Sequence, residues 1–323
     1  MASEAIVGIG VAPEITSDAR QSPAGGTRAA LGDFWALTKP EINFLIGIAA
    51  FAGFQLGWRD VGRPEMGWPV PHAFPFLLLI HALLGTLLVA SGAATLNQYV
   101  ERRFDAQMHR TARRPLVAGR IRPAGALWFG ILLSASGALY LAVATTALAS
   151  LLAVVTFAAY LFLYTPLKRK TPLCTLVGAF PGAMPPLIGY AAATGRLSLG
   201  AWVLYIILFL WQFPHFMSIA WMYREDYDRA GYKILPRGAA RFRLVAVQTI
   251  LPLLALVPIS LAVAPPGQAG ILCFAGALLL SSGFFYYGTR FVLHRSCASA
   301  RRLLFASIIY LPSLFIVLIV LRR

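Results

Sequence analysis

Acidic residues are scarce in this chain and are absent from most of its length. Only 12 Asp and Glu occur among 323 residues, none lies between Asp105 and Glu225, and none follows Asp228. Charged residues of both signs make up 12% of the chain and hydrophobic residues 59%, whereas soluble domains carry about 25% charged residues. The scarcity of charge excludes an ordinary soluble domain and indicates a protein that crosses a membrane several times.

The alternation of polar and apolar residues that marks a transmembrane β-barrel is also missing. The apolar runs are continuous instead, and in lipid such a run satisfies its backbone hydrogen bonds as a helix. Nine runs are long enough to cross the hydrocarbon layer of a bilayer. They cover about residues 36–57, 73–97, 124–144, 147–165, 173–193, 200–221, 242–264, 268–289 and 302–321. The predicted fold is an all-α bundle of nine transmembrane helices.

The N-terminal 32 residues lack the apolar run that a signal peptide requires. They are rich in Ala, Gly, Ser and Pro, so we predict a disordered tail over residues 1–32 and one membrane domain over residues 33–323. The cysteines have no metal-ligand spacing and are interpreted as packing residues. They are Cys174, Cys273 and Cys297.

Basic residues are distributed unevenly between the two sides of the predicted bundle. Most of the 28 Lys and Arg precede the first span or follow spans two, four, six and eight. Because basic connections stay in the cytoplasm, the N-terminus and these four connections are predicted to be cytoplasmic. The net charge of +16 then follows from topology, so we expect no nucleic-acid partner, although part of the charge is available to an anionic substrate.

Three oxygen-bearing side chains, Asn97, Glu101 and Asp105, recur at intervals of four residues at the end of the second span. If the helix continues through them, they share one face, with neighbours about 6 Å apart. Carboxylate and amide oxygens are suitable ligands for Mg²⁺. The row therefore predicts a magnesium site; the alternative is a solvated helix end that is neutralised by its own arginines.

A second acidic group, Glu225, Asp226 and Asp228, follows span six and falls on the same side of the membrane as the first. Two carboxylate groups at the same depth can face one another across a bundle and hold a diphosphate through bound metal ions. We predict that all three residues are metal ligands. The alternative is a charged loop with local ion pairs.

Cations lie next to both acidic groups. Arg110 and Arg114 follow the first row, and Lys168 and Arg169 follow span four, close to Tyr164. Lys and Arg bind phosphate oxygens, and Arg does so through two parallel hydrogen bonds. We place these five residues in the catalytic site together with the first row; the alternative is that the cations only anchor the membrane edge.

Spans five and six contain residues that are unusual in membrane helices. Residues 178–190 include three Pro and three Gly, which predict a kinked helix that forms either the wall of a substrate cavity or a tight packing surface. Gln212 and His215 lie in span six, where polar residues are candidates for function. His215 is suited to contact a substrate carboxylate, to ligate a haem iron or to bond internally.

These motifs resemble those of the UbiA-type intramembrane prenyltransferase superfamily. Its first aspartate-rich motif, Asn-x-x-x-Asp-x-x-x-Asp, is matched from Asn97 to Asp105, with Glu101 in the first acidic position. Its second motif, Asp-x-x-x-Asp, is not matched by the spacing of the second acidic group, which leaves open which of those residues bind metal. The resemblance covers about residues 33–321.

Within the superfamily the chain resembles the branch that farnesylates haem B. The likeness rests on four runs of sequence, residues 97–116, 164–169, 182–189 and 211–231. It implies a nine-helix bundle around a central cavity, Mg²⁺ as cofactor, and transfer of farnesyl from farnesyl diphosphate to a vinyl group of haem B, giving haem O and diphosphate. It also implies substrate binding by Gln212, His215, Arg224 and Tyr227.

The resemblance further implies a bacterial inner-membrane protein, surrounded by membrane lipid, that passes its product to a haem A synthase or to terminal oxidase assembly. The alternatives are a related prenyltransferase for a quinone precursor or chlorophyllide, an anion transporter, and a structural assembly protein. A transporter favours charges within the spans and internal repeats. Ionisation of an allylic diphosphate needs cations at the leaving group and a dry chamber for the carbocation, which a membrane bundle supplies.

Overall fold

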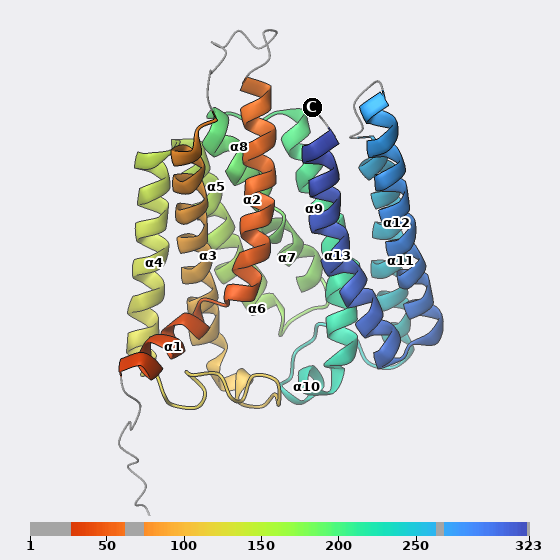
Figure 1. Cartoon of the computed structure of the whole chain (residues 1–323). Coiled ribbons are helices and arrows are strands. Elements are labelled where there is room, and N and C mark those ends of the chain that lie inside the picture. The colour runs from red at the N-terminus through yellow and green to blue at the C-terminus, as the bar shows by residue number, and fades with distance from the viewer. Residues whose placement is uncertain (1–26, 62–73, 263–267, 322–323) are drawn as a thin grey trace, which may run out of the picture.

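The protein is a bundle of long helices, shown in Figure 1. The computed structural model describes residues 27–61, 74–262 and 268–321, and these residues form helices and turns but no strand. The elements are α1 (Thr27–Leu37), α2 (Pro40–Val61), α3 (Phe76–Asp105), α4 (Pro123–Ala144), α5 (Ala147–Ala158), the π-helix η2 (Ala159–Tyr164), α6 (Thr165–Leu167), α7 (Cys174–Gly182), α8 (Pro185–Thr194), α9 (Leu199–Met222), α10 (Arg224–Arg229), α11 (Ala239–Leu261), α12 (Gln268–His294) and α13 (Cys297–Leu321).

Nine segments of the described chain are long and apolar enough to cross a membrane, as predicted. Two of these segments are composite: α5, η2 and α6 form the fourth, and α7 and α8 form the fifth. Large apolar side chains face outward along the bundle, as is required of helices whose surroundings are lipid. The predicted all-α fold with nine spans is confirmed.

The first span begins at Pro40 rather than near residue 36, because the chain breaks between α1 and α2. Proline has no backbone N–H and disfavours the helical conformation in the residue before it. At this break Lys39 adopts a positive φ of 54°, which is uncommon for residues other than glycine. The predicted boundary between tail and domain at residue 32 falls inside α1, and residues 1–26 of the predicted tail lie outside the described residues.

Helix α3 runs to Asp105, beyond the predicted end of the second span near residue 97. The helix therefore continues through the first acidic row, as its spacing requires. Asn97, Glu101 and Asp105 are all buried, so the row faces the interior of the bundle and is not a solvated helix end.

Span five is broken between α7 and α8, where Pro185 and Pro186 open the second helix, and the predicted kink is confirmed. Helices α2 and α8 cross in close contact. A Cβ atom at Gly53 would overlap the carbonyl oxygen of Pro186, and one at Gly189 would overlap that of Ala50. For α8 these contacts support tight packing, the second interpretation of this segment.

Two of the three cysteines pack in the interior, as predicted. Cys174 and Cys273 are buried, whereas Cys297 is exposed at the start of α13. Its interpretation as a packing residue is wrong, because the basic turn that precedes α13 lies at the end of the bundle and outside its core.

Both acidic groups lie at the same end of the bundle. In Figure 1 the connection after α3 and the short helix α10 lie at the lower end, as do α1 and the turn between α12 and α13. The fold therefore brings together segments that are more than 100 residues apart in the sequence.

Candidate active site

Helix α3 presents the first acidic row to two cations from different parts of the chain. Lys168 donates from Nζ to both carboxylate oxygens of Glu101, at 2.8 and 3.0 Å. Arg114 donates from Nη1 to Oδ2 of Asp105 at 2.6 Å. Charge-assisted hydrogen bonds of this kind are strong and fix the orientation of the carboxylate. The row is thus neutralised by two of the cations that the sequence placed in the site.

Asn97 connects two further elements to the row. Its Nδ2 donates to Oγ1 of Thr165 at 3.1 Å, and its Oδ1 accepts a hydrogen bond from Nζ of Lys39 at 3.2 Å. Neither Lys39 nor Thr165 was predicted as a site residue. The signal that the sequence offers for Lys39 is its position directly before Pro40, where a span begins.

The cations around the row influence one another. Burial, followed by the positive charges of Arg114 and Lys168, lowers the pKa of Lys39 to about 7, although nearby carboxylates partly offset these effects. Burial acts to lower the pKa of Lys168 as well, but the Glu101 carboxylate outweighs it, and the pKa lies well above its usual value. A bound phosphate would add negative charge and so favour the charged form of both lysines.

Of the second acidic group, Asp226 makes contact with the first motif. It is buried in α10 and accepts hydrogen bonds from the backbone N–H of Arg110 and from Arg229, both at 3.2 Å. Arg110 also donates from Nη2 to the hydroxyl of Tyr227 at 3.2 Å, and its guanidinium lies 4.7 Å from the ring centroid of Tyr223. The two acidic groups are therefore joined directly through the connection after α3.

An apolar cluster supports this junction. Met108, Ala230 and Tyr232 are its buried members, and Phe104 packs against them. The hydroxyl of Tyr232 is buried and has no hydrogen-bond partner of standard geometry among the described residues. Burial, followed by the negative charge of Glu101, raises the pKa of Tyr232, and a hydrogen-bonding interaction with Glu101 acts in the same direction, so the hydroxyl keeps its proton. The sequence did not identify Tyr232.

The third predicted element, the turn after α6, joins the same cluster. The backbone N–H of Lys233 donates to the carbonyl oxygen of Lys168 at 2.7 Å. The ammonium group of Lys168 lies 4.7 Å from the ring centroid of Tyr164, and the guanidinium of Arg169 lies 4.0 Å from that of Phe104. All three predicted elements thus converge at one end of the bundle.

The remaining residues of the second acidic group point elsewhere. Glu225 is exposed and pairs with its neighbour Arg224 at 3.2 Å. Asp228 accepts hydrogen bonds from Arg241 of α11 at 2.8 and 3.0 Å. Arg224 turns toward α13 and donates to the sulfur of Cys297 at 3.5 Å. These contacts favour Asp226 over Glu225 and Asp228 as a metal ligand.

Gln212 and His215 make contacts inside the bundle. Gln212 donates from Nε2 to the carbonyl oxygen of Ala179 in α7 at 3.1 Å. Nδ1 of His215 lies 2.8 Å from Oγ of Ser307 in α13, and the imidazole stacks on Trp211 with ring centroids 4.6 Å apart. Because Nδ1 is in contact with Ser307, Nε2 is the ring nitrogen with which His215 can bind a substrate.

A protein-family model matches most of the chain, including both acidic motifs. The model of the UbiA prenyltransferase family matches residues 61–310, a range that contains both acidic groups. The chain belongs to the UbiA prenyltransferase family. Several similar curated relatives carry the name protoheme IX farnesyltransferase. The one from Solibacter usitatus is 46% identical over 284 residues, which cover 88% of this chain and 96% of the relative. The one from Koribacter versatilis is 41% identical over 303 residues, which cover 92% and 95%.

Solved structures of UbiA proteins share the architecture. A structure described as digeranylgeranylglyceryl phosphate synthase has a TM-score of 0.67 at 15% identity, covering 90% of this chain and 98% of that one. A UbiA homologue from Aeropyrum pernix gives 0.60 at 22% identity, covering 82% and 94%. A homologue from Archaeoglobus fulgidus, bound to GPP and Mg²⁺, gives 0.59 at 13% identity, covering 88% and 99%. The family resemblance of the sequence is confirmed.

The donors in this UbiA prenyltransferase suit Mg²⁺ in company with a diphosphate. Within the described residues, no three side chains of His, Cys, Asp or Glu come close enough to hold a metal ion by themselves. The buried donors are oxygen atoms, from Asn97, Glu101, Asp105 and Asp226. Mg²⁺ takes such hard ligands and completes its coordination with water and phosphate oxygens.

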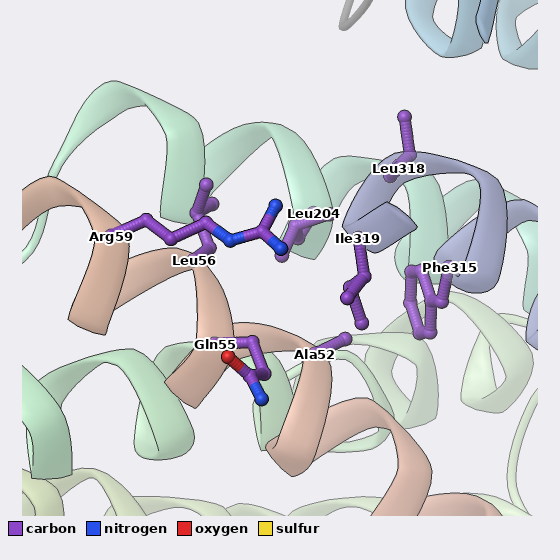
Figure 2. A pocket seen from close by; sticks show the side chains of 8 residues that line it. All are labelled: Ala52, Gln55, Leu56, Arg59, Leu204, Phe315, Leu318 and Ile319. Carbon is purple, nitrogen blue, oxygen red and sulfur yellow. The ribbon is translucent and has the colours of Figure 1, made fainter. Parts of the chain in front are cut away.

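A cavity near the opposite end of this UbiA protein is too small to be the active site. It lies between α2, α9 and α13, and Figure 2 shows Arg59 extending toward Leu204 there. Its volume is about 20 Å³, which is room for about one water molecule. The candidate active site is the carboxylate and cation cluster, where the predicted motifs meet.

Proposed function

We propose that this chain transfers the farnesyl group of farnesyl diphosphate to a vinyl group of haem B, to which a hydroxyl group from water also adds, giving haem O and diphosphate. The observation that carries the proposal is the group of relatives named protoheme IX farnesyltransferase, which are between 34% and 46% identical over most of the chain. The cluster of buried carboxylates and cations supports the diphosphate part of this chemistry.

Departure of diphosphate is the step that the cluster is suited to assist. As the allylic carbon–oxygen bond breaks, negative charge develops on the leaving oxygen, and cations that are already aligned lower the energy of that state. Lys39, Arg114 and Lys168 surround the first row. Mg²⁺, when bound to the carboxylate oxygens, supplies further positive charge and orients the diphosphate.

Binding of a metal–diphosphate complex would replace the existing ion pairs with new ones and leave no buried charge unpaired. Glu101 and Asp105 are paired with Lys168 and Arg114. In such a complex Glu101 and Asp105 would hold the metal, and Lys168 and Arg114 would hold phosphate oxygens. Because an uncompensated buried charge is costly, the two ion pairs explain how a buried acidic row is stable before the substrate arrives.

Haem binding is proposed for the residues that the resemblance assigns to it. Tyr227 contacts Arg110 and so lies beside the carboxylate cluster. His215 and Gln212 lie within α9, between that cluster and the middle of the bundle. We place the tetrapyrrole along this part of α9, with Nε2 of His215 facing it. Arg224 lies at the end of the same path, where α9 gives way to α10.

We also propose that the acidic end faces the cytoplasm of a bacterial cell and that the chain resides in the inner membrane, since the basic connections lie at this end. The protein is then surrounded by lipid, and its apolar product passes to a haem A synthase or to terminal oxidase assembly. The alternative functions are prenylation of a quinone precursor or chlorophyllide, and anion transport.

Haem extracted from a bacterial strain that lacks haem O tests the proposal. Expression of this chain should produce a species heavier than haem B by one farnesyl group and one hydroxyl group, detected by mass spectrometry. The Asp105→Asn variant, inserted at the same level, should produce none. A prenylated quinone or chlorophyllide without any haem product would contradict the proposal and favour the related activity.

A further inference from the structure

A second cavity lies at the acidic end of the bundle, where α12 turns into α13. Its volume is about 440 Å³, within the range of small-molecule sites. The end of α12 and the start of α13 line it, and it shares no lining residue with the candidate active site. Neither the sequence motifs nor the prenyl transfer accounts for it.

The cavity is cationic. Arg290 lines it from α12 and Arg302 from α13. Arg290 is in contact with the hydroxyl of Tyr286 at 3.0 Å and with Nε2 of His294 at 3.3 Å, neither of which carries negative charge. Arg302 makes no hydrogen bond or ion pair with any other residue that the structure describes.

Among the residues that the structure describes, no carboxylate forms an ion pair with Arg290 or Arg302. The sequence contains no Asp or Glu after residue 228. Glu225 is linked to the start of α13 only through Arg224, which pairs with it at 3.2 Å and also contacts Cys297. Two guanidinium groups that share a cavity, with no anionic partner among the described residues, favour a bound anion.

The start of α13 adds backbone donors to the cavity. Ser296 and Ser299 cap each other, because the N–H of each donates to the hydroxyl of the other at 3.2 and 3.1 Å. The N–H of Ala298, which also lines the cavity, has no acceptor within its own helix. The positive end of this 25-residue helix therefore acts together with the two arginines.

Two tyrosines indicate that the cavity lies at the boundary between lipid and water. Tyr286 and Tyr287 line it and are exposed on the outer surface of α12, one helical turn before Arg290. Leu293 and Phe305 are exposed nearby in sequence on the same two helices. Tyrosine collects at the boundary between lipid and water, with its ring toward the apolar side. The cavity thus has a cationic part and an apolar border.

We propose that this cavity binds the phosphate group of an anionic phospholipid, with Arg290 and Arg302 on the phosphate and the two tyrosines beside the glycerol and the upper acyl chains. A soluble phosphate offers the same anionic group but makes no use of the apolar border. A zwitterionic lipid carries its own cation and so neutralises the arginines less well.

Native mass spectrometry of the full-length protein in detergent tests the proposal. The probes are phosphatidylglycerol and phosphatidylcholine with the same acyl chains, and inorganic phosphate. The wild type should retain phosphatidylglycerol in preference to phosphatidylcholine, and Arg290→Gln/Arg302→Gln should retain at least roughly tenfold less of it, since two charge-assisted contacts are lost. Arg301→Gln is the matched control for the single variant Arg302→Gln, because each removes one positive charge and Arg301 does not line the cavity.

Equal loss of lipid in Arg301→Gln and in Arg302→Gln would overturn the proposal in favour of general surface attraction. Undiminished retention in the double variant would overturn it as well. If the protein binds inorganic phosphate but shows no preference between the two lipids, the proposal of a lipid site is overturned, and the ligand is a soluble phosphate. Both arginines are exposed, so the variants should unfold at the wild-type temperature in lipid-free detergent. If the double variant unfolds at a lower temperature, lipid retention is compared in the two single variants instead.

Discussion

The backbone N–H of Arg110 donates to a carboxylate oxygen of Asp226 at 3.2 Å, across 116 residues of sequence. This hydrogen bond joins the connection after α3 to α10 and holds the two acidic groups together. Because the donor is a backbone group, substitution of the Arg110 side chain leaves the bond possible, whereas substitution of Asp226 weakens or removes it.

Asp226 should therefore be the essential acid of the second group. We expect Asp226→Asn to lower the rate of prenyl transfer by about 100-fold or more, the size of effect seen when one electrostatic contact to a transition state is lost. Glu225→Gln removes an exposed carboxylate next to it in the sequence and should stay close to wild type. The measurement is haem O formed per minute by purified protein with farnesyl diphosphate, haem B and Mg²⁺.

A comparison of the loss of activity in the two variants shows which carboxylate is essential. A larger loss in Glu225→Gln than in Asp226→Asn would show that α10 rotates when substrate binds, so that a different carboxylate meets the metal. Removal of Mg²⁺ with a chelator should abolish activity in the wild type and in Glu225→Gln alike.

Substitutions in the Glu101–Lys168 pair should affect stability and activity differently. Both side chains are nearly buried, and loss of one partner from a buried pair costs about 3–5 kcal/mol. We expect Lys168→Met to destabilise the protein, and Glu101→Gln/Lys168→Met to recover most of that loss because no charge remains alone. Both should be inactive, since each lacks a cation for the diphosphate. Thermal unfolding and product formation, measured on the same preparations, check this. Additive destabilisation in the double variant would contradict the pairing.

Lys39 should make stability depend on pH. Its pKa is lowered to about 7 from a usual value of 10.5, so between these values the unfolded chain binds more protons than the folded one. The free energy of unfolding therefore rises with pH across this window. Arg114 and Lys168 oppose the charge of Lys39, and Glu101 and Asp105 favour it.

We expect Lys39→Met to lose this rise in unfolding temperature between about pH 7 and pH 10. Lys170→Met, which removes an exposed lysine from the turn after α6, should keep it. The same slope in wild type and Lys39→Met would contradict the assignment of this pH dependence to Lys39.

Helical periodicity and spacing predicted much of this protein. The nine spans follow from the length of apolar runs, and the buried face of α3 follows from the interval of four between Asn97 and Asp105. The selection of Asp226 depends on how α10 turns, which is set by contacts with residues more than 100 positions away. The role of Lys39 depends on a break in the chain that brings its side chain to Asn97. Neither relationship has a local signature in the sequence.

The crossing of α2 and α8 should tolerate no added methyl group. A Cβ at Gly53 would overlap the backbone of Pro186, and backbone atoms cannot move aside as a flexible side chain can. Overpacking of this kind costs about 1–3 kcal/mol, so Gly53→Ala should unfold at a lower temperature. Gly283→Ala in α12 is the control, because a Cβ there meets nothing within 4 Å and alanine favours the helix by about 0.5–1 kcal/mol. Equal stability of the two variants would contradict the close crossing.

His215 offers a test of where haem binds, because its two ring nitrogens have different partners. Nδ1 lies 2.8 Å from the hydroxyl of Ser307, while no hydrogen bond within the described residues uses Nε2. If Nε2 binds the tetrapyrrole, His215→Ala should weaken haem binding by about tenfold, the effect of losing about 1.4 kcal/mol, and leave farnesyl diphosphate binding intact. Ser307→Ala removes the internal bond and keeps the imidazole, so it should lower the unfolding temperature with a smaller effect on haem. Titration of both variants with haem, followed by absorbance, separates the two roles. Wild-type haem affinity in a folded His215→Ala protein would leave His215 with only the packing role that its contacts with Trp211 and Ser307 already provide.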